Sequence, residues 1–427
     1  MTMNKKEITA RSLALESLIA VERDGRYPNL EIDSRIKRSG LTDADRGLYT
    51  RLVYGVTERR ITLDYIISQF SKTPVTELDA DVLTALRLGV YQLAFMDRIP
   101  EHAAVGETVE LVGGSRKGYV NAVLRSYVRA GKPMCLPERD GNFTGYCSVK
   151  YSVPEPLVRH FASAYGEDET EKLLGAMNGE PKVGLRVNTL KITPGEAAER
   201  LGGRLSQVAE DVILVDGLDE RAKAGIEQGE WFVQDEASRA ATVLLGAKPG
   251  ETVVDTCACP GGKSFSIAVD IRNEGRIYSY DLHANKLPLI EKGAKKLGIT
   301  VIETGERDAR QPNEELIGKA DRVLCDAPCS GLGVIAKKPD IRYKNLDDIA
   351  RLPEIQYAVL CGAAEYVRDG GVLVYSTCTL NPEENEKVVR RFLDAHGEYK
   401  LETMKTFFPH RDGCDGFFAA KMTKERQ

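Results

Sequence analysis

Apolar residues recur at helical spacing through the first part of the chain. The spacing predicts helices over residues 11–21, 76–93 and 119–127. Thr76 precedes an acidic first turn and is expected to cap the second of these helices. Because no strand pattern and no catalytic-looking cluster accompanies them, residues 1–130 are predicted to form an all-helical binding or structural module.

The pattern changes beyond this module. Residues 131–150 are rich in glycine and proline and are expected to be a linker. A helical pattern over residues 157–177 is followed by strand-type alternation, which predicts a small α+β subdomain. Its expected strands cover residues 183–188, 212–215 and 231–233, and its expected helix covers residues 194–201.

From Val253 onward, short strand-type runs alternate with helical patterns. This alternation predicts a doubly wound α/β sheet covered by helices. The expected strands cover residues 252–254, 275–280, 299–302, 320–324 and 371–375, and the expected helices cover residues 264–270, 286–297 and 353–367.

Composition bounds the class of protein. The 427 residues are 42% hydrophobic and 29% charged, so two or three domains with real cores are expected. The sequence has no run of eighteen apolar residues, and its first eight residues lack the apolar core of a secretory signal. Nine cysteines, an odd number in a long chain, indicate a reducing compartment. We therefore expect a cytoplasmic protein without a membrane span.

The net charge of −5 is unevenly distributed along the chain. Residues 1–150 hold 22 Lys and Arg against 19 Asp and Glu (+3), which leaves 37 against 45 (−8) for the remainder. Two basic stretches, Arg116 to Lys132 and Lys337 to Lys344, are the expected RNA-binding surfaces, although a solvated helix face is the alternative for the first.

The first turn of the predicted sheet, Asp255 to Ser264, joins a strand ending at an acid to two glycines and a helix start. It is neither a Gly-x-Gly-x-x-Gly fingerprint nor a P-loop, because Cys257 stands where a P-loop has its first glycine. Such a turn suits a ligand with a carboxylate and a nucleoside. A purely structural turn is the alternative.

Two further acids, Asp281 and Asp308, follow the next two strands. Asp281 is positioned to bind two ribose hydroxyls, and Asp308 to reach an adenine amino group. Either acid alone would equally fit a helix cap or a turn. Three acids after three successive strands together favour a nucleoside site.

Two later strands end in cysteine-bearing turns, which would bring Cys329 and Cys378 to one cleft together with Asp326. Asn381 and Pro382 suit the start of a helix, whose dipole would favour the Cys378 thiolate. One alternative is a pair of small buried thiols. A zinc site is disfavoured because the Cys-x-Cys and Cys-x3-Cys spacings are unusual ligand spacings.

These motifs resemble the RNA cytosine-5 methyltransferases. The resemblance rests on Asp-x-Cys-Ala-x-Pro-Gly-Gly-Lys (255–263), Asp-Ala-Pro-Cys-Ser-Gly-x-Gly (326–333) and Ser-Thr-Cys-Thr followed by Asn-Pro-Glu-Glu-Asn-Glu (376–386). The N-terminal module resembles the NusB antitermination-factor fold, and residues 415–420 resemble the last strand of the family. In this order, the parts resemble bacterial small-subunit (16S) rRNA enzymes of the RsmB (Sun/Fmu) family.

The resemblance implies a multidomain fold. The expected parts are a NusB-like helical RNA-binding domain (1–135), a linker (136–155), a small RRM-like α+β subdomain (156–245) and a Rossmann-like methyltransferase domain (246–427). It also implies a monomer with S-adenosylmethionine as cofactor, an unpaired or opened 16S rRNA cytosine as substrate, and no DNA, membrane or metal partner.

The site residues follow from the same resemblance. Cys378 is the expected nucleophile, and Cys329 is the expected second cysteine that assists product release. Cys259 departs from the family pattern, which has Ala there. The expected cofactor-binding residues are Cys257, Ala258, Cys259, Pro260, Gly261, Gly262, Lys263, Asp281, Asp308 and Asp326.

The chemistry of cytosine is consistent with these roles. C5 is too weak a nucleophile to take a methyl group unaided, and addition of a thiolate at C6 makes it enamine-like. A protonated Asp326, with a pKa raised by burial, is expected to stabilise charge on the ring. Cys329, or a water that it positions, is the expected base for the C5 proton.

Two rival functions stay open at this stage. The first is a cytosine-5 enzyme that acts on tRNA. A DNA enzyme resembles this chain less, because DNA enzymes place their nucleophile in the Pro-Cys of the middle motif. The second is a non-catalytic RNA-binding ribosome assembly factor. A damaged cofactor site would favour this second function, yet all three acids and both cysteines are present.

Overall fold

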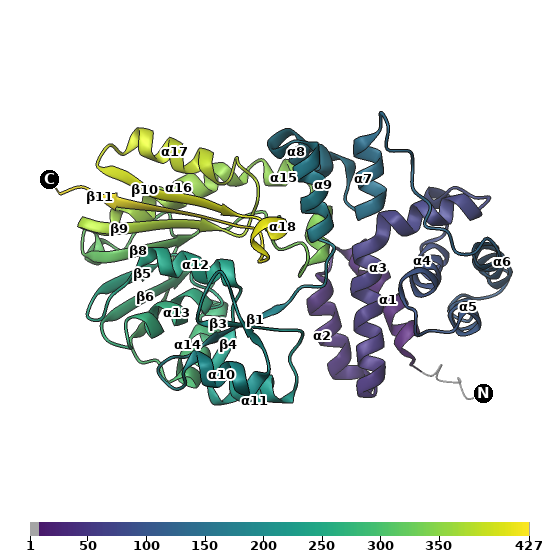
Figure 1. The fold of residues 1–427 in the computed structure, drawn as a ribbon, viewed down its shortest axis with the longest axis horizontal. Helices are drawn as coiled ribbons and strands as arrows, with labels where there is room; N and C mark the ends of the chain where they lie inside the picture. The colour runs from purple at the N-terminus through teal and green to yellow at the C-terminus, as the bar shows by residue number, and fades with distance from the viewer. Residues whose placement is uncertain (1–7, 427) are drawn as a thin grey trace. The chain divides into compact units, whose positions relative to one another are not determined.

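The computed structural model describes residues 8–426, which form two compact units (Figure 1). The helical unit comprises residues 8–178 and 338–343, and the α/β unit comprises residues 179–337 and 344–426. The expected lack of a secretory signal was based on the first eight residues, and most of these lie outside the described part of the chain. Within residues 8–426, no helix is both long and apolar enough to cross a membrane.

The helical unit confirms the predicted helices around residues 11–21 and 119–127. The first helix starts with a capping box between Thr9 and Ser12 and ends at Gly25, whose φ of 64° is left-handed. Thr76 does not cap a helix, because it lies in a 3-10 turn and the helix starts only at Ala80. The helices of this unit before the predicted linker are α1 (Ala10–Asp24), α2 (Pro28–Ser39), α3 (Asp43–Phe70), α4 (Ala80–Phe95), α5 (Glu101–Val109) and α6 (Arg116–Arg129).

The predicted linker is partly helical. Helix α7 (Phe143–Tyr151) lies within it, and the Asn142 side chain caps that helix by accepting from the Gly145 amide. The single helix expected over residues 157–177 is divided at Gly166 into α8 (Glu155–Tyr165) and α9 (Glu167–Ala176). The helical unit therefore extends to Asn178, beyond the expected start of the α+β subdomain.

A short 3-10 segment, η4 (Pro339–Tyr343), completes the helical unit. Arg342 is 1% exposed, and its Nη1 donates to the carbonyl oxygens of Glu58, Tyr151 and Ser152 at 2.9, 3.2 and 3.3 Å. The Tyr343 hydroxyl donates to the Thr57 carbonyl at 3.0 Å. This part of the second predicted basic stretch is thus a buried anchor, not a solvated phosphate-binding surface.

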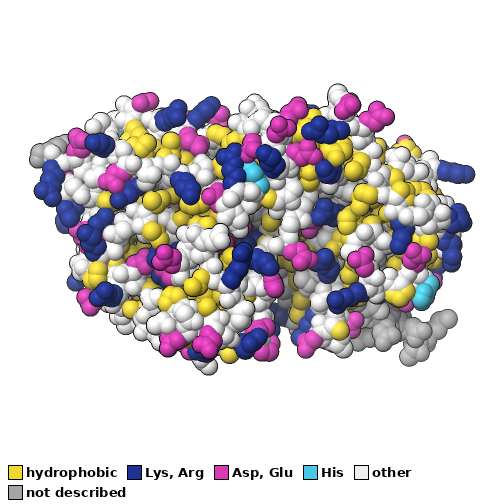
Figure 2. All heavy atoms as spheres, viewed as in Figure 1, with side chains coloured by type: hydrophobic (Ala, Val, Ile, Leu, Met, Phe, Trp, Pro, Cys, Tyr) yellow, Lys and Arg dark blue, Asp and Glu magenta, His cyan; other side chains and the backbone are white. Residues whose placement is uncertain are grey.

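Several other charges of the two basic stretches form ion pairs, and those of Arg116 and Lys117 are exposed. Lys337 Nζ lies 2.6 Å from Asp235 Oδ2 and 2.8 Å from Asp415 Oδ2. In the first stretch, Arg116 and Lys117 pair with Asp81 and Glu110, both at 2.5 Å. Figure 2 shows Lys and Arg side chains mixed with Asp and Glu over the visible face.

The small sheet of the α/β unit confirms the predicted α+β subdomain. Its strand order is β2-β3-β1-β4, and every pairing is antiparallel. Trp231, Leu185 and Ile213 form its core. The elements are β1 (Val183–Val187), α10 (Pro194–Leu201), β2 (Arg204–Leu205), β3 (Val212–Val215), α11 (Glu220–Gln228) and β4 (Trp231–Val233).

The large sheet has the order β10-β11-β9-β8-β5-β6-β7, with parallel pairing from β9 to β7 and antiparallel pairing of β11 and β10. Strand order reverses between β5 and β8, so a crevice is expected at their carboxyl ends. The strands are β5 (Thr252–Asp255), β6 (Arg276–Asp281), β7 (Ile302–Glu306), β8 (Ala320–Asp326), β9 (Val367–Thr377), β10 (Tyr399–Phe407) and β11 (Phe417–Lys424).

Helices cover both faces of this sheet, as the doubly wound prediction requires. Val253 and Val374 pack with α12, α13 and α14, whereas Val254 and Leu373 pack with α16 and α17. The strand predicted over residues 299–302 is wrong in position. The observed strand, β7, starts only at Ile302, several residues after Gly298 ends α14. The helices are α12 (Glu236–Leu245), α13 (Gly262–Asp270), α14 (Leu287–Leu297), α15 (Leu346–Ile349), α16 (Leu352–Glu365), α17 (Glu386–Ala395) and α18 (Pro409–Asp412).

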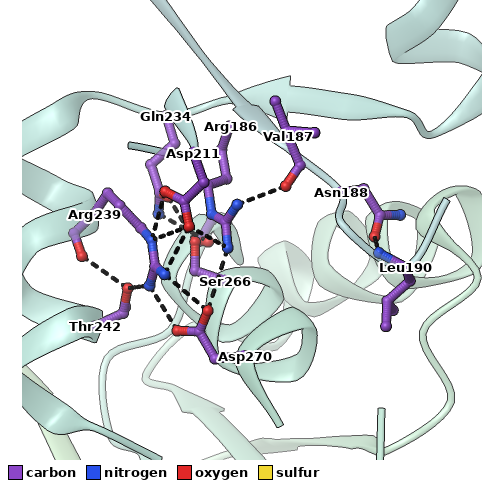
Figure 3. A network of polar contacts seen from close by, with 11 residues as sticks. Arg186, Val187, Asn188, Leu190, Asp211, Gln234, Arg239, Thr242, Ser266 and Asp270 are labelled. Carbon is purple, nitrogen blue, oxygen red and sulfur yellow. Dashed lines mark hydrogen bonds and ion pairs between the residues drawn. The ribbon is translucent and has the colours of Figure 1, made fainter. Parts of the chain in front are cut away.

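A buried ionic cluster joins the small sheet to α12 and α13 (Figure 3). Arg239 donates to Asp211 and Asp270 at 2.6–3.2 Å, and Arg186 Nη2 lies 3.0 and 3.2 Å from the same two carboxylates. Burial, together with the neighbouring Arg239, lowers the pKa of Arg186 to about 10. At the other end of α13, Gln234 Nε2 donates to the Gly262 carbonyl at 3.0 Å. Both ends of α13 are therefore fixed by residues that precede the large sheet.

Replacing Arg239 with Ala is expected to destabilise the α/β unit by about 3–5 kcal/mol, because Asp211 and Asp270 would keep only one guanidinium between them. Urea unfolding followed by the fluorescence of Trp231, the chain's single tryptophan, measures this change. The matched control is Arg368→Ala, whose ion pair with Asp321 is exposed and should contribute less than about 1 kcal/mol. Equal losses in the two variants would contradict the prediction.

Candidate active site

The cofactor turn predicted over Asp255 to Ser264 connects β5 to α13. Gly261 has φ 110°, and a Cβ atom there would lie 2.5 Å from the Phe265 ring, so only glycine fits. The Ala258 and Gly261 amides bond to the carbonyls of Tyr280 and Ala258 at 2.7 Å. These bonds fix the conformation of the turn and tie it to the end of β6, at the switch point of the sheet.

The acids Asp281, at the end of β6, and Asp308, just after β7, differ in their contacts. Asp281 accepts from the backbone amides of Cys259 at 3.3 Å and His283 at 3.0 Å, so it is tied to the turn directly. Asp308 accepts from the Arg310 guanidinium at 2.5–3.1 Å, which holds its pKa below the usual value. A ligand that used Asp308 would have to share it with Arg310.

Asp255 is buried beneath the turn. Its Oδ2 accepts from the Ser264 hydroxyl at 2.7 Å, and its Oδ1 has no hydrogen-bond partner in residues 8–426. Burial raises the pKa of Asp255 to about 7, against the effect of the Ser264 hydrogen bond. Burial and the Asp281 charge also raise the pKa of Cys259 to about 12, which leaves that thiol neutral beside the turn.

Asp326, at the end of β8, contacts Lys263 of the turn. Lys263 Nζ lies 2.6 Å from Asp326 Oδ2, and the Ser376 hydroxyl donates to Oδ1 at 2.7 Å. Burial acts to lower the pKa of Lys263, but the Asp326 carboxylate outweighs it and raises that pKa. The Asp326 carboxyl group is thus in contact with an ammonium and a hydroxyl, and its expected protonation stays a prediction.

The two predicted cysteines lie side by side at the ends of β8 and β9. Their Sγ atoms are 3.3 Å apart. Contact with the Cys378 thiol, together with burial, raises the pKa of Cys329 well above its usual value. The charge of Lys263 also interacts with Cys378. The arrangement thus pairs one protonated thiol with a second sulfur that lies near an ammonium.

A buried carboxylate that the sequence analysis did not single out holds the two cysteine turns together. Glu384 is fully buried and accepts from the Ser330 amide at 2.8 Å and from Gln356 Nε2 at 2.9 Å. The hydroxyls of Ser330 and Thr379 lie 2.6 Å apart. The only signal in the sequence was the Asn-Pro-Glu-Glu-Asn-Glu motif, which we interpreted as a helix start.

The helix expected to begin at Asn381 begins at Glu386. Residues 382–385 instead form turns, in which the Glu383 amide bonds to the Asn381 side chain at 3.2 Å. The expected dipole effect of this helix on Cys378 is therefore lost. Lys263 is the nearby positive group that favours a thiolate at this position.

The metal alternative gains no support from the described chain. Residues 8–426 contain no group of three or more His, Cys, Asp or Glu side chains arranged to hold a metal ion. The cysteines are free thiols, and Cys325 and Cys257 have pKa values raised mainly by burial.

Comparison with known proteins accounts for every part of this architecture. The NusB family matches residues 8–129, the RsmF/B-like ferredoxin-like domain matches 153–218, and the 16S rRNA methyltransferase RsmB/F family matches 242–423. A probable ribosomal RNA small subunit methyltransferase B from Bacillus subtilis (strain 168) is 38% identical over 448 residues, which cover 98% of this chain and 100% of the relative. The chain belongs to the RsmB family.

A second relative and one solved structure match nearly the whole chain, and another solved structure matches part of it. The Synechocystis protein of the same name is 35% identical over 98% of this chain and 100% of its own length. The crystal structure of PH0851 is 28% identical, has a TM-score of 0.78 and covers 98% of this chain and 100% of that one. The structure of a methyltransferase homologue from Pyrococcus horikoshii is 27% identical and has a TM-score of 0.58. It covers 65% of this chain and 97% of that one. The predicted NusB-like and Rossmann-like parts are confirmed, and the predicted small α+β subdomain matches the ferredoxin-like domain of the family.

The cofactor of the RsmB family is S-adenosylmethionine, and the residues present fit it. A nucleoside needs acceptors for its ribose hydroxyls, and Asp281 provides a carboxylate at the rim of the turn. The glycine-only conformation at Gly261 leaves the backbone open to close approach by a ligand. The buried, unpartnered Oδ1 of Asp255 is an acceptor of the kind that a ligand amine could use.

Proposed function

We propose that this RsmB-family protein methylates C5 of a cytosine in 16S rRNA, yielding 5-methylcytosine through a covalent adduct of Cys378. The single observation that carries this proposal is the 3.3 Å approach of the Cys329 and Cys378 sulfurs beside the Lys263–Asp326 pair. Paired thiols suit an enzyme that must both form and break a bond to a ring carbon. The names of the relatives support ribosomal RNA as the substrate.

The cofactor residues take separate roles in this proposal. Asp281 binds the ribose hydroxyls, Asp308 the adenine amino group, and residues 257–263 the methionine end, with Asp326 between cofactor and base. S-adenosylmethionine supplies an electrophilic methyl group when bound. Burial keeps the Cys259 thiol neutral. A neutral thiol behaves as a small apolar side chain, so it can replace the Ala of the family pattern.

Cys378 opens the reaction on the base. Its thiolate adds to C6 of cytosine, and the electron density released into the ring makes C5 able to take the methyl group. Lys263 stabilises the thiolate before attack, because its charge interacts with Cys378. The base must leave its stack to be reached, so the substrate is an unpaired or transiently opened region of the rRNA.

Lys263 and Asp326 together bind the polar edge of cytosine. A charged Asp326 can accept from the exocyclic amine, and the Lys263 ammonium can donate to N3 as charge builds on the ring. The Ser376 hydroxyl, 2.7 Å from Asp326, fixes the carboxylate for this contact. The donor expected in Asp326 is thereby assigned to its lysine partner.

Cys329 acts in the release step. After methyl transfer the C5 proton leaves to water, and the electrons of that C–H bond expel Cys378 from C6. The Cys329 sulfur lies 3.3 Å from that of Cys378 in the free protein, so a protonated Cys329 can donate toward the departing sulfur. This donor role is proposed beside the base role expected from the sequence.

The test of this function is product analysis. Purified protein, small-subunit rRNA and S-adenosylmethionine labelled in the methyl group are incubated, and the RNA is digested to nucleosides. Label in 5-methylcytidine is the expected result. Label only when tRNA replaces rRNA would overturn the substrate, and cofactor binding with no transfer to either RNA would favour the non-catalytic assembly factor.

A further inference from the structure

A cationic groove lies between α16 and α17, outside the thiol site. It is a shallow, open depression of about 510 Å³, lined by Tyr357, Lys387, Arg390, Arg391, Asp394 and Ala395. Figure 1 shows the two helices adjacent on the same side of the large sheet. Neither basic stretch predicted from the sequence includes these residues.

Helix α17 is divided into a buried face and a charged face by its own spacing. Val388, Val389 and Phe392 are buried against the sheet. Lys387, Arg390 and Arg391 occupy the opposite face at helical spacing and are exposed. The groove therefore presents three cations in about one turn of helix.

The cations of the groove are available to an anionic ligand. Arg390 makes no hydrogen bond or ion pair with any described residue. Lys387 and Arg391 pair with the exposed acids Glu383 at 2.6 Å and Glu354 at 2.7 Å. Exposed ion pairs of this kind contribute little net stability, so a phosphate can displace the acids at small cost.

An aromatic ring prepares one cation for this role. The Arg391 guanidinium lies over the Tyr357 ring with its carbon 3.9 Å from the ring centroid. Stacking holds the planar guanidinium flat, which leaves its edge free to donate to phosphate oxygens in pairs. Lys337 differs, because it is held between the Asp235 and Asp415 carboxylates.

Helix α16 links the groove to the cysteine turn. Gln356, the neighbour of Tyr357 on α16, donates to the Pro328 carbonyl at 2.9 Å, and Pro328 precedes Cys329. The same helix therefore lines the groove and contacts the turn that carries Cys329.

We propose that the α16–α17 groove binds the sugar–phosphate backbone of the RNA strand flanking the target cytosine. This proposal rests on the RNA methyltransferase function proposed above. Single-stranded RNA is the occupant that fits, because the groove combines clustered cations with a partly exposed aromatic ring that aligns one of them.

The test compares Lys387→Glu/Arg390→Glu with wild type in RNA affinity over a range of salt concentrations. Each phosphate contact on a single strand contributes a slope of about −0.7 in log K against log salt. The double variant is expected to flatten the slope by about 0.7–1.4 and to weaken binding about tenfold near 0.1 M salt. The control Lys295→Glu/Lys319→Glu changes the net charge by the same amount, on α14 and just before β8. Its RNA affinity and salt slope should stay closer to those of wild type.

Affinities and slopes that are the same for the two double variants would overturn the groove proposal while leaving the methyltransferase function intact. Absence of methyl transfer to any RNA by wild type would instead overturn the function on which the groove depends. Cofactor affinity, expected to be unchanged in both variants, checks that the large sheet has folded. Tyr357→Phe should retain RNA affinity and Tyr357→Ala should lose it, which ties the effect to the ring.

Discussion

Cys378→Ala is expected to abolish methyl transfer to RNA, by a factor of about 10⁴ or more, because no other group can add to C6 and activate C5. Cofactor affinity should stay close to that of wild type, since the Asp281 contacts do not involve Cys378. Labelled-methyl transfer to rRNA and equilibrium binding of S-adenosylmethionine measure the two quantities separately.

Cys329→Ala is the matched partner in this experiment, since it removes the other sulfur of the same 3.3 Å pair. It should still form the C6 adduct but release it slowly, so a covalent protein–RNA band should persist on a denaturing gel. Cys378→Ala should give no band. A band that follows Cys378→Ala instead would reverse the two roles and assign the nucleophile to Cys329.

Gly333→Ala is expected to lower activity at least about 100-fold with little change in cofactor affinity. A Cβ atom at Gly333 would lie 1.8 Å from the Gly416 carbonyl oxygen and 2.9 Å from the Cys378 carbonyl oxygen. Backbone atoms cannot yield as a flexible side chain can, so the turn carrying Cys378 must move. A displacement of about 1 Å at reacting groups is enough for a loss of this size.

The prediction depends on how tightly three segments are joined at this position. The Gly333 amide donates to the Cys378 carbonyl at 3.0 Å, and the Gly416 amide donates to the Gly333 carbonyl at 2.9 Å. Gly397→Ala is the control, because nothing lies within 4 Å of its Cβ position. Activity in Gly333→Ala equal to that of Gly397→Ala would show that the Cys378 turn tolerates the shift.

The alternation of strands and helices was readable from the sequence because its cause is local. Each strand of a covered parallel sheet is a short apolar run, and Val253 and Val254 face opposite helix layers within one such run. The acids at strand ends were predictable for the same reason. Asp255, Asp281 and Asp326 are the last residues of their strands.

The predicted start of α17 at Asn381 was wrong, because tertiary contacts outweighed the local preference of these residues for a helix start. Asn381 and Pro382 have the right chemistry for a helix start. Buried Glu384, however, bonds to the Ser330 amide and to Gln356, which holds this segment as a turn. No local pattern reveals a contact between residues more than fifty positions apart.

The second basic stretch was misread for a related reason. A run containing Lys337 and Arg342 resembles a phosphate-binding surface when only charge is counted. Arg342 instead donates to backbone carbonyls inside the helical unit, and Lys337 neutralises Asp235 and Asp415. A buried cation and a solvated one have the same sequence signature.

The burial of η4 has a consequence for how the chain is made. Residues 8–178 leave the ribosome well before Pro339 to Tyr343 are synthesised, yet the structure counts these five residues among the helical unit. Until Arg342 arrives, the carbonyl of Ser152 lacks a donor that it has in the finished protein. Domains usually fold in order of synthesis. Here the first unit is completed only after most of the second has been translated.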